Sequence, residues 1–403
     1  MSLKTFPVRS LFAGEMTIKG LWDYVQRKAK EALQFVPCKS FSRTRVAVDM
    51  MGFCYPIMMD ARFRVARNWD VVRSSIDEEA INPVYMRLFM NALISLLESG
   101  ITPIFVFEFG RNPLKKKTDE KRTFEREYAL ERIATLRGEL QADVFGHGNK
   151  RKVEELRKLE AQLKLFPKSV KEATFDLLVK LGVPTVRGKK GVEAERIASI
   201  LCMVDVASAV YSPDGDCLAH GAPIQIRDRS KDIFTDGFGD RAFSVCDRTT
   251  LLELLDVTSE EFTELCVCSG CDYNENMKNI GFKKSLDLIY EHGSIENFPE
   301  KYDTTCLLHS SVLPAFGMAS VDELVSEECV EYYNIKNWKS FSLQIAVPKS
   351  IDGVLEKYKL TNFKDEFLQK AGDVPPANDY VHFETVGGFT QVNFPDGGVP
   401  FEK

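Results

Sequence analysis

Three short apolar segments that each end in an acidic residue constrain the fold of this 403-residue chain more than any other feature. These segments are Val46 to Val48 before Asp49, Ile104 to Phe107 before Glu108, and Ala207 to Tyr211 before Asp214. Each has the length and apolar character of a buried β-strand. Helical patterns at residues 83–98 and 192–204 separate them. The sequence therefore predicts an α/β fold with a mostly parallel central sheet flanked by helices, and acids just past the strand ends would meet at one edge of it.

Composition excludes several classes of protein. With 44% hydrophobic residues the chain can fill a core, and no run of 18 uncharged apolar residues predicts a membrane span. The first fifteen residues lack the apolar stretch of a secretory signal, and ten scattered cysteines are typical of reduced thiols. We therefore expect an intracellular protein without membrane contact. Cys266, Cys268 and Cys271 have no matching second pair, so buried thiols are favoured there over a zinc site.

Charge is unevenly distributed along the chain, although the net value is −6. Basic residues concentrate at positions 115–117, 121–122, 150–152 and 283–284, while many acids stand singly at the ends of apolar segments. This pattern is typical of a nucleic-acid enzyme with an acidic metal site, whereas a solvated helix face explains any one basic patch taken alone.

The stretch between Glu108 and Glu193 is rich in Lys, Arg and Glu. Helical spacing at residues 124–140 and 153–165 is interrupted at Gly146-His147-Gly148. The sequence predicts two solvated helices that bury little by themselves and become ordered when a ligand binds.

Seven carboxylates stand out by their positions: Asp49, Glu108, Glu193, Glu195, Asp214, Asp216 and Asp272. Glu193 and Glu195 open a predicted helix, where the helix dipole favours negative charge. A helix cap or a solvated turn explains any single one of the seven. If the seven converge, however, each close pair of carboxylates would repel by about 4 kcal/mol at 4 Å with an effective dielectric near 20. Bound cations would then be needed to keep the carboxylates ionised. Oxygen-only ligands select Mg²⁺ or Mn²⁺ over zinc.

The order and spacing of these motifs resemble the flap endonuclease (XPG-type 5′ nuclease) family over residues 16–300. The resemblance rests on residues 45–49, residues 107–108 with 113–115 and 121–122, Val192 to Glu195, Ser212 to Asp216, and Ser269 to Tyr273 continuing into residues 279–284. It implies a PIN-like 5′ nuclease core with a helical arch and a helix–two-turn–helix. The chain then divides into an extension (1–15), an N-terminal nuclease region (16–110), an arch insert (111–190), an internal nuclease region (191–300) and a C-terminal region (301–403).

The resemblance also implies roles for individual residues. Asp49, Glu108, Glu193 and Glu195 would lie towards one Mg²⁺, and Asp214, Asp216 and Asp272 towards a second, with Mn²⁺ able to substitute. Lys115 and Arg122 would meet the scissile phosphate as catalytic cations. The residues expected to contact DNA are Tyr55, Arg62, Lys121, Gly281, Lys283 and Lys284. A K⁺ ion is also expected in the helix–two-turn–helix. From the residues alone, a core tyrosine explains Tyr55 as well as a DNA contact does, and the alternative for Lys115 and Arg122 is a solvated helix face.

Some positions depart from the family pattern. Glu108-Phe109 replaces the usual Asp-Gly, residues 16–22 have Thr17 where Gly is usual, and Asn279 replaces a turn glycine. Asn tolerates positive φ better than most residues. No glutamine-anchored tail with paired aromatics predicts sliding-clamp binding. These differences suggest a distant branch of the family, such as that of a large DNA virus, acting in the nucleus or at a site of viral DNA replication.

The predicted function is that of a structure-specific 5′ flap endonuclease and 5′–3′ exonuclease that hydrolyses DNA by a two-metal mechanism in replication, repair or recombination. Its partners would be DNA with flaps, nicks or junctions. Two alternatives remain, a four-way-junction resolvase of the same family and a catalytically silent nucleic-acid-binding scaffold. The 84 residues between Glu108 and Glu193 suffice for a closed arch, which favours flaps and free 5′ ends.

Overall fold

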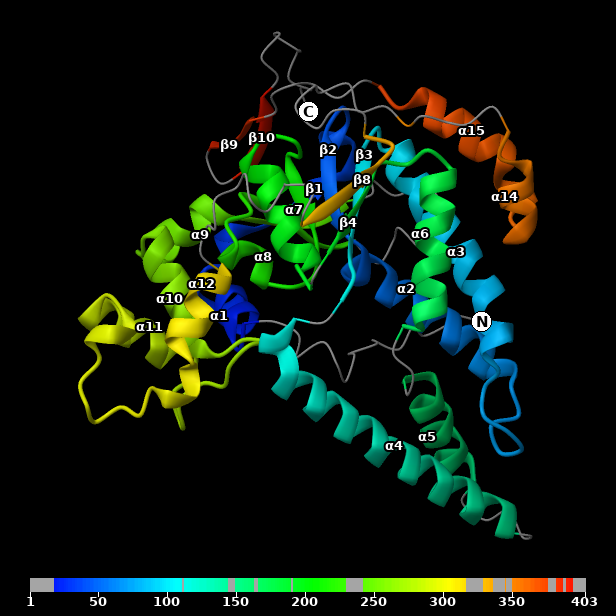
Figure 1. The fold of residues 1–403 in the computed structure, drawn as a ribbon, viewed down its shortest axis with the longest axis horizontal. Coiled ribbons are helices and arrows are strands. Elements are labelled where there is room, and N and C mark those ends of the chain that lie inside the picture. The colour runs from blue at the N-terminus through cyan, green and yellow to red at the C-terminus, as the bar shows by residue number, and fades with distance from the viewer. Residues whose placement is uncertain are drawn as a thin grey trace.

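The computed structural model describes residues 18–110, 112–143, 149–162, 166–189, 191–229, 242–316, 329–335, 345, 350–375, 382–386 and 389–393. Within these ranges eight strands form one sheet in the order β1-β7-β6-β5-β2-β3-β4-β8. The sheet lies among the helices of the molecule (Figure 1). Its strands are β1 (Leu33–Pro37), β2 (Arg45–Asp49), β3 (Thr102–Glu108), β4 (Thr185–Gly188), β5 (Ala209–Tyr211), β6 (Ile224–Arg229), β7 (Ala242–Asp247) and β8 (Val330–Tyr333).

The central strands of this sheet, from β6 through β5, β2 and β3 to β4, run parallel. The strands β7, β1 and β8 pair antiparallel at its two sides. The predicted mostly parallel sheet is therefore confirmed. A separate hairpin of β9 (His382–Val386) and β10 (Phe389–Asn393) follows near the C-terminus.

Helices cover both faces of the sheet, as alternating side chains on β3 show. Phe105 and Phe107 belong to the core cluster beneath α2 (Met50–Asn68), α3 (Glu78–Glu98) and α6 (Lys168–Lys180). Ile104 and Val106 belong to a different cluster, beneath α7 (Ala194–Met203). Strand residues alternate between faces, so a strand that is apolar at every position must be buried on both sides. This is why β3 reads as a continuous apolar run.

The helix α3 is long and apolar enough to cross a membrane by length and composition alone. Within the fold, however, 61% of its most apolar window is buried, and Phe89 and Leu93 are fully covered. It is therefore packed as a core helix of the sheet.

A second cluster joins the helices beside the sheet. Its helices are α1 (Leu21–Lys28), α8 (Asp216–Ala219), α9 (Arg248–Leu255), α10 (Ser259–Ser269), α11 (Phe282–His292) and α12 (His309–Phe316). The helices α10 and α11 and the loop between them form the predicted helix–two-turn–helix. Asn279 in this loop has φ 62°, the positive value expected of the residue that replaces a glycine.

The predicted arch helices are α4 (Lys116–Ala142) and α5 (Asn149–Gln162), which extend from the body of the molecule (Figure 1). Gly146-His147-Gly148 lies outside the described residues. The two helices bury more than the sequence suggests, since Leu136 and Leu156 are completely covered in the main core. Arg137 of α4 also donates to the Val71 carbonyl oxygen and pairs with Glu160 of α5. The expectation that these helices bury little by themselves is therefore wrong, whereas ordering of the segment when a ligand binds stays a prediction.

The core sheet extends beyond the regions drawn from sequence. α6 and β4 fall within the predicted insert yet belong to the sheet layer, and β8 comes from the C-terminal region. In that region α14 (Asp352–Lys357) and α15 (Lys364–Asp373) add Leu355 and Phe367 to the main core. Short 3-10 helices complete the described chain at Lys30–Ala32, Cys38–Phe41, Pro113–Lys115, Ile295–Asn297, Thr305–Leu307 and Thr361–Phe363.

All ten cysteines are free thiols, and eight of them are buried. Cys266, Cys268 and Cys271 lie in the helical cluster, where burial raises the pKa of each thiol. They are buried thiols, as predicted.

Candidate active site

The fold gathers acids from separate parts of the chain at the carboxyl edge of the sheet. Asp49 and Glu108 end β2 and β3, which are neighbouring parallel strands. Asp214 and Asp216 follow β5 on the other side of β2. The remaining acids come from the start of α7, at Glu193 and Glu195, and from the loop after α10, at Asp272.

Asp49 is held in place by its own helix and by a neighbouring loop. Its carboxylate accepts hydrogen bonds from the backbone amides of Met51 and Gly52, each 3.0 Å long, which caps α2. The Ser212 hydroxyl donates to the same carboxylate over 2.9 Å. A Cβ on Gly52 would stand 2.4 Å from Asp49 Oδ2, so only glycine permits this close approach.

The loop that carries Asp214 and Asp216 is fixed from beneath by Gln225. The side-chain amide of Gln225 donates to the carbonyl oxygens of Ser212 and Asp214, at 2.8 and 2.6 Å. The backbone amide of Asp216 donates to Asp214 Oδ1 over 3.0 Å. Both carboxylates are thereby kept at the sheet edge, where α8 begins.

Burial and mutual repulsion act together on these acids. Desolvation, partly offset by the Ser212 hydrogen bond and reinforced by Glu108, raises the pKa of Asp49 to about 6. Desolvation and the charge of Asp272 raise the pKa of Asp216 to about 7. The pKa values of Glu195 and Asp214 are also raised well above their usual range, by burial first and then by neighbouring carboxylates. The seven acids thus form one electrostatically linked cluster that favours bound positive charge.

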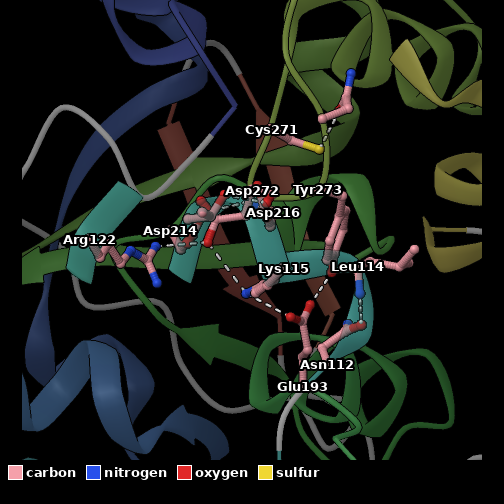
Figure 2. Close-up of polar contacts among 12 residues, drawn as sticks. Asn112, Leu114, Lys115, Arg122, Glu193, Asp214, Asp216, Cys271, Asp272 and Tyr273 are labelled. Atoms are coloured by element: carbon pink, nitrogen blue, oxygen red, sulfur yellow. Dashed lines mark hydrogen bonds and ion pairs between the residues drawn. The ribbon is translucent and has the colours of Figure 1, made fainter. Parts of the chain in front are cut away.

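Positive charge from this chain already enters the cluster (Figure 2). Lys115 Nζ lies 2.6 Å from Glu193 Oε1 and 3.4 Å from Asp272 Oδ2. An Arg122 guanidinium nitrogen lies 3.1 Å from the same oxygen of Asp272. Burial lowers the pKa of Lys115, but the nearby acids outweigh that effect and raise it well above its usual value. The structure therefore brings both predicted catalytic cations into the predicted metal site.

Three buried carboxylate oxygens in the cluster accept no hydrogen bond from the described residues. Glu193 Oε1 is ion-paired with Lys115, whereas Glu195 Oε2 and Asp216 Oδ1 have neither kind of partner among the described residues. Buried polar atoms are normally paired, so these oxygens have unused capacity to bind a cation. Among the described residues, no three His, Cys, Asp or Glu side chains are arranged as a ready metal site. The acids lie at one edge of the sheet with the ammonium group of Lys115 between Glu193 and Asp272, and their role as metal ligands stays a prediction.

Sequence reasoning missed several residues that hold this arrangement. The Thr118 hydroxyl donates to the backbone oxygen of Asp272 over 2.7 Å, which ties the start of α4 to the α10–α11 loop. Ser212 and Gln225 support the acids as described above, and the hydroxyl of Tyr273 donates to Glu193 Oε2. Ser212 and Tyr273 stand inside motifs that were singled out, whereas no local pattern distinguishes Gln225.

The predicted DNA-contacting residues divide into accessible and buried ones. Lys283 and Lys284 are exposed on the first turn of α11, and Gly281 is exposed just before it. Lys121 is exposed on α4, and Tyr55 is half-buried on α2. These five positions are accessible, as DNA contacts require, and their roles remain predictions.

Arg62 does not fit the prediction. Its side chain is only 1% exposed and donates to both carboxylate oxygens of Glu78, at 2.9 and 2.7 Å. A guanidinium that is enclosed between α2 and the start of α3 cannot reach a DNA phosphate in this conformation. The prediction of a DNA contact is corrected here to that of a structural ion pair.

We expect Arg62→Ala to lower the free energy of unfolding by about 2 kcal/mol, because it removes a buried side chain and its packing together with the ion pair to Glu78. DNA affinity should change less than twofold. Denaturant unfolding and fluorescence anisotropy measure the two effects. Arg64→Ala is the matched control, since Arg64 pairs with Asp60 on the surface of the same helix, and it should change stability by less than about 1 kcal/mol. Unchanged stability with greatly weakened DNA binding would restore the original prediction.

Comparison with known proteins agrees with this geometry. The XPG N-terminal domain model matches residues 16–129, and the XPG I-region model matches residues 182–272. Flap endonuclease 1-A of Oryza sativa subsp. japonica is 31% identical over 285 residues, covering 71% of this chain and 69% of the relative. Flap endonuclease 1 of Zea mays is 30% identical over 289 residues, with 71% and 69% covered.

Solved structures share the fold. The flap endonuclease-1 from Methanococcus jannaschii superposes with a TM-score of 0.55 at 21% identity, covering 85% of this chain and 97% of that one. The catalytic core of Rad2 in complex with DNA substrate gives a TM-score of 0.53 at 16% identity, with 87% and 99% covered. The domain matches and the relatives together show that this chain belongs to the XPG-type flap endonuclease family.

Proposed function

We propose that this protein cuts DNA at 5′ flaps, using two Mg²⁺ ions held by the acidic cluster. Its family membership makes it a metal-dependent, structure-specific DNA nuclease. The observation that carries the finer proposal is the insertion of Lys115 and Arg122 into a cluster of buried carboxylates. Acids that hold cations and bases that meet phosphate are thus already within contact distance of one another.

The residues present fit divalent cations. The donor set consists of carboxylate oxygens, which Mg²⁺ and Mn²⁺ prefer, and two of these buried oxygens lack a partner among the described residues. Asp49, Glu108, Glu193 and Glu195 would hold one ion, and the Asp214, Asp216 and Asp272 carboxylates would hold the other. When bound, a pair of such ions lowers the pKa of an attacking water and stabilises the leaving 3′ oxygen.

The chain's own residues then have distinct tasks. Lys115 is the residue just before α4 and Arg122 lies near the start of that helix, and both side chains reach the acids from there. We propose that the scissile phosphate draws the Lys115 and Arg122 side chains away from Glu193 and Asp272. Each basic side chain would then pair with the phosphate, and metal ions would take its place beside the carboxylates. There they would stabilise the extra negative charge of the transition state. The same movement would free the carboxylates to bind metal.

The duplex would be held by the α10–α11 segment. No side chain caps α11 among the described residues, so the amides of its first turn can receive a phosphate oxygen. Lys283 and Lys284 extend from that turn, and such contacts recognise the backbone rather than the sequence. The predicted K⁺ site in this loop also remains a proposal.

A 5′ flap would engage both parts of the protein at once. The α10–α11 segment suits a duplex, whereas α4 and α5 form a projecting pair beside the acids that suits a single strand (Figure 1). The proposed metal site would lie where these two parts meet, because Thr118 and Arg122 of α4 both contact Asp272 in the α10–α11 loop. Incision is therefore expected within about one nucleotide of the junction, where bent DNA deforms at lower cost than continuous duplex.

The proposal is tested with labelled flap, nick, gap and four-way-junction DNAs under single-turnover conditions. We expect the 5′ flap to be cut fastest, and a protein block bound to the flap's 5′ end beforehand to slow cutting. A block placed on the duplex end distant from the flap is the control. Faster cutting of the four-way junction than of the flap would favour the resolvase alternative, and no cleavage of any substrate in Mg²⁺ would favour a silent scaffold.

A further inference from the structure

Tyr273 contacts two members of the proposed catalytic machinery at once (Figure 2). It follows Asp272 in the α10–α11 loop and is only 3% exposed. Its hydroxyl donates a hydrogen bond to Glu193 Oε2, and Lys115 Nζ lies 5.6 Å from the centre of its ring. We propose that Tyr273 is a positioning residue, whose hydroxyl sets the orientation of the Glu193 carboxylate for cation binding. This inference rests on the proposed function of the acidic cluster.

The ring of Tyr273 is fixed by aromatic packing. Phe316 of α12 meets it edge-on, with ring centres 5.3 Å apart. Phe316 in turn packs on His220, with ring centres 4.9 Å apart, and His220 directly follows α8, which begins at Asp216. All three rings are buried. A side chain whose rotamer is locked in this way holds its hydroxyl at a defined point, which a flexible surface residue could not do.

The two oxygens of Glu193 are therefore used differently. Oε2 accepts the Tyr273 hydroxyl, and Oε1 faces the positive charge of Lys115 at 2.6 Å. Glu193 stands just before α7 without a side-chain capping bond, so its own helix does not fix its carboxylate. The tyrosine supplies that constraint and directs Oε1 towards the place where a cation is bound. Loss of an outer partner of a metal ligand typically weakens metal affinity by about 10- to 100-fold.

The decisive variant is Tyr273→Phe, which removes the hydroxyl and keeps the ring against Phe316 and Lys115. Mn²⁺ binding to the full-length, DNA-free protein is measured by titration calorimetry. We expect the affinity to fall by about 10- to 100-fold. In flap cleavage, the Mg²⁺ concentration giving half the maximal rate should rise by a similar factor, while saturating Mg²⁺ should restore the rate to within a few-fold.

Tyr333→Phe is the matched control. Tyr333 also donates to a glutamate, reaching Glu331 Oε2 over 2.9 Å, but that pair lies on β8, away from the acidic cluster. Its removal should leave Mn²⁺ affinity unchanged. Thermal unfolding of each variant in chelator separates a loss of metal affinity from a loss of folded structure.

The outcomes are distinguishable from failure of the proposed function. If the unaltered protein binds Mn²⁺ and cuts flaps, wild-type affinity in Tyr273→Phe overturns this inference alone. A rate defect in that variant that saturating Mg²⁺ does not relieve would also overturn it, because the hydroxyl would then act in the chemical step. If the unaltered protein neither binds Mn²⁺ nor cuts DNA, it is the proposed function that fails.

Discussion

Asp216→Ala is expected to lower the rate of flap cleavage in Mg²⁺ by on the order of a thousandfold or more. The substitution removes a buried oxygen of the proposed metal site, Oδ1, that has no partner among the described residues. A bound cation contributes several kcal/mol to transition-state stabilisation, and each 1.36 kcal/mol changes the rate tenfold. The single-turnover rate on a labelled flap is the measurement. Asp214→Ala should show a similar loss of activity, with an added loss of stability because the Asp216 amide then lacks its acceptor.

Two further results are expected of Asp216→Ala. Its melting temperature in chelator should rise, because the substitution removes one of several carboxylates that repel one another in a buried site. Binding of flap DNA without metal should be unchanged or tighter, since a negative charge near the phosphate is gone. Asp60→Ala, at a surface acid on α2, is the control for all three readouts. Strong cleavage by both Asp214→Ala and Asp216→Ala in Mg²⁺ would contradict the assignment of the metal site.

Lys115→Ala and Arg122→Ala are each expected to reduce the single-turnover rate by on the order of a hundredfold, as loss of one charged transition-state donor does. DNA affinity should fall much less, because phosphate contacts are spread over many basic residues. Lys116→Ala is the matched control, since Lys116 is the next residue on the chain and its side chain is 80% exposed. Equal losses of rate and affinity would mean that Lys115 and Arg122 only hold DNA.

The metal-free stability of Lys115→Ala should change in the direction opposite to that of Asp216→Ala. Lys115 neutralises Glu193 and Asp272 in the structure, so its removal leaves their repulsion uncompensated. Its melting temperature in chelator should therefore fall, and added Mg²⁺ should recover most of the difference. A variant that is as stable as the unaltered protein in chelator would show that the ion pairs at Lys115 contribute nothing to the metal-free fold.

Much of the fold could be predicted because local patterns report burial directly. The apolar segments before Asp49 and Glu108 became β2 and β3, and their acids lie at adjacent strand ends because parallel strands end at the same edge. The positive φ of Asn279 was likewise expected from a single residue type. Such features depend on a few neighbouring residues, so a linear sequence contains them.

Other predictions depended on which surface each side chain faces, and some of these were wrong. Arg62 has the residue type of a DNA contact, but the position of Glu78 on the next helix makes it a buried ion pair. The charged segment that forms α4 and α5 appeared solvated throughout, yet Leu136 and Leu156 reach the main core. Helical spacing alone does not show that a narrow apolar stripe will find a partner on α2 or in the sheet.

The sequence by itself determined the alternation of strands and helices, the acids at the strand ends and the family to which the chain belongs. Only the tertiary structure decided how the site is held together. The hydroxyl of Tyr273 reaches a glutamate 80 positions earlier in the chain, and Arg122 reaches an aspartate 150 positions later. Such contacts arise because the packed layers bring distant segments of the chain together. Which residues meet is set by the geometry of the whole core, and a pattern of neighbouring residues does not contain that information.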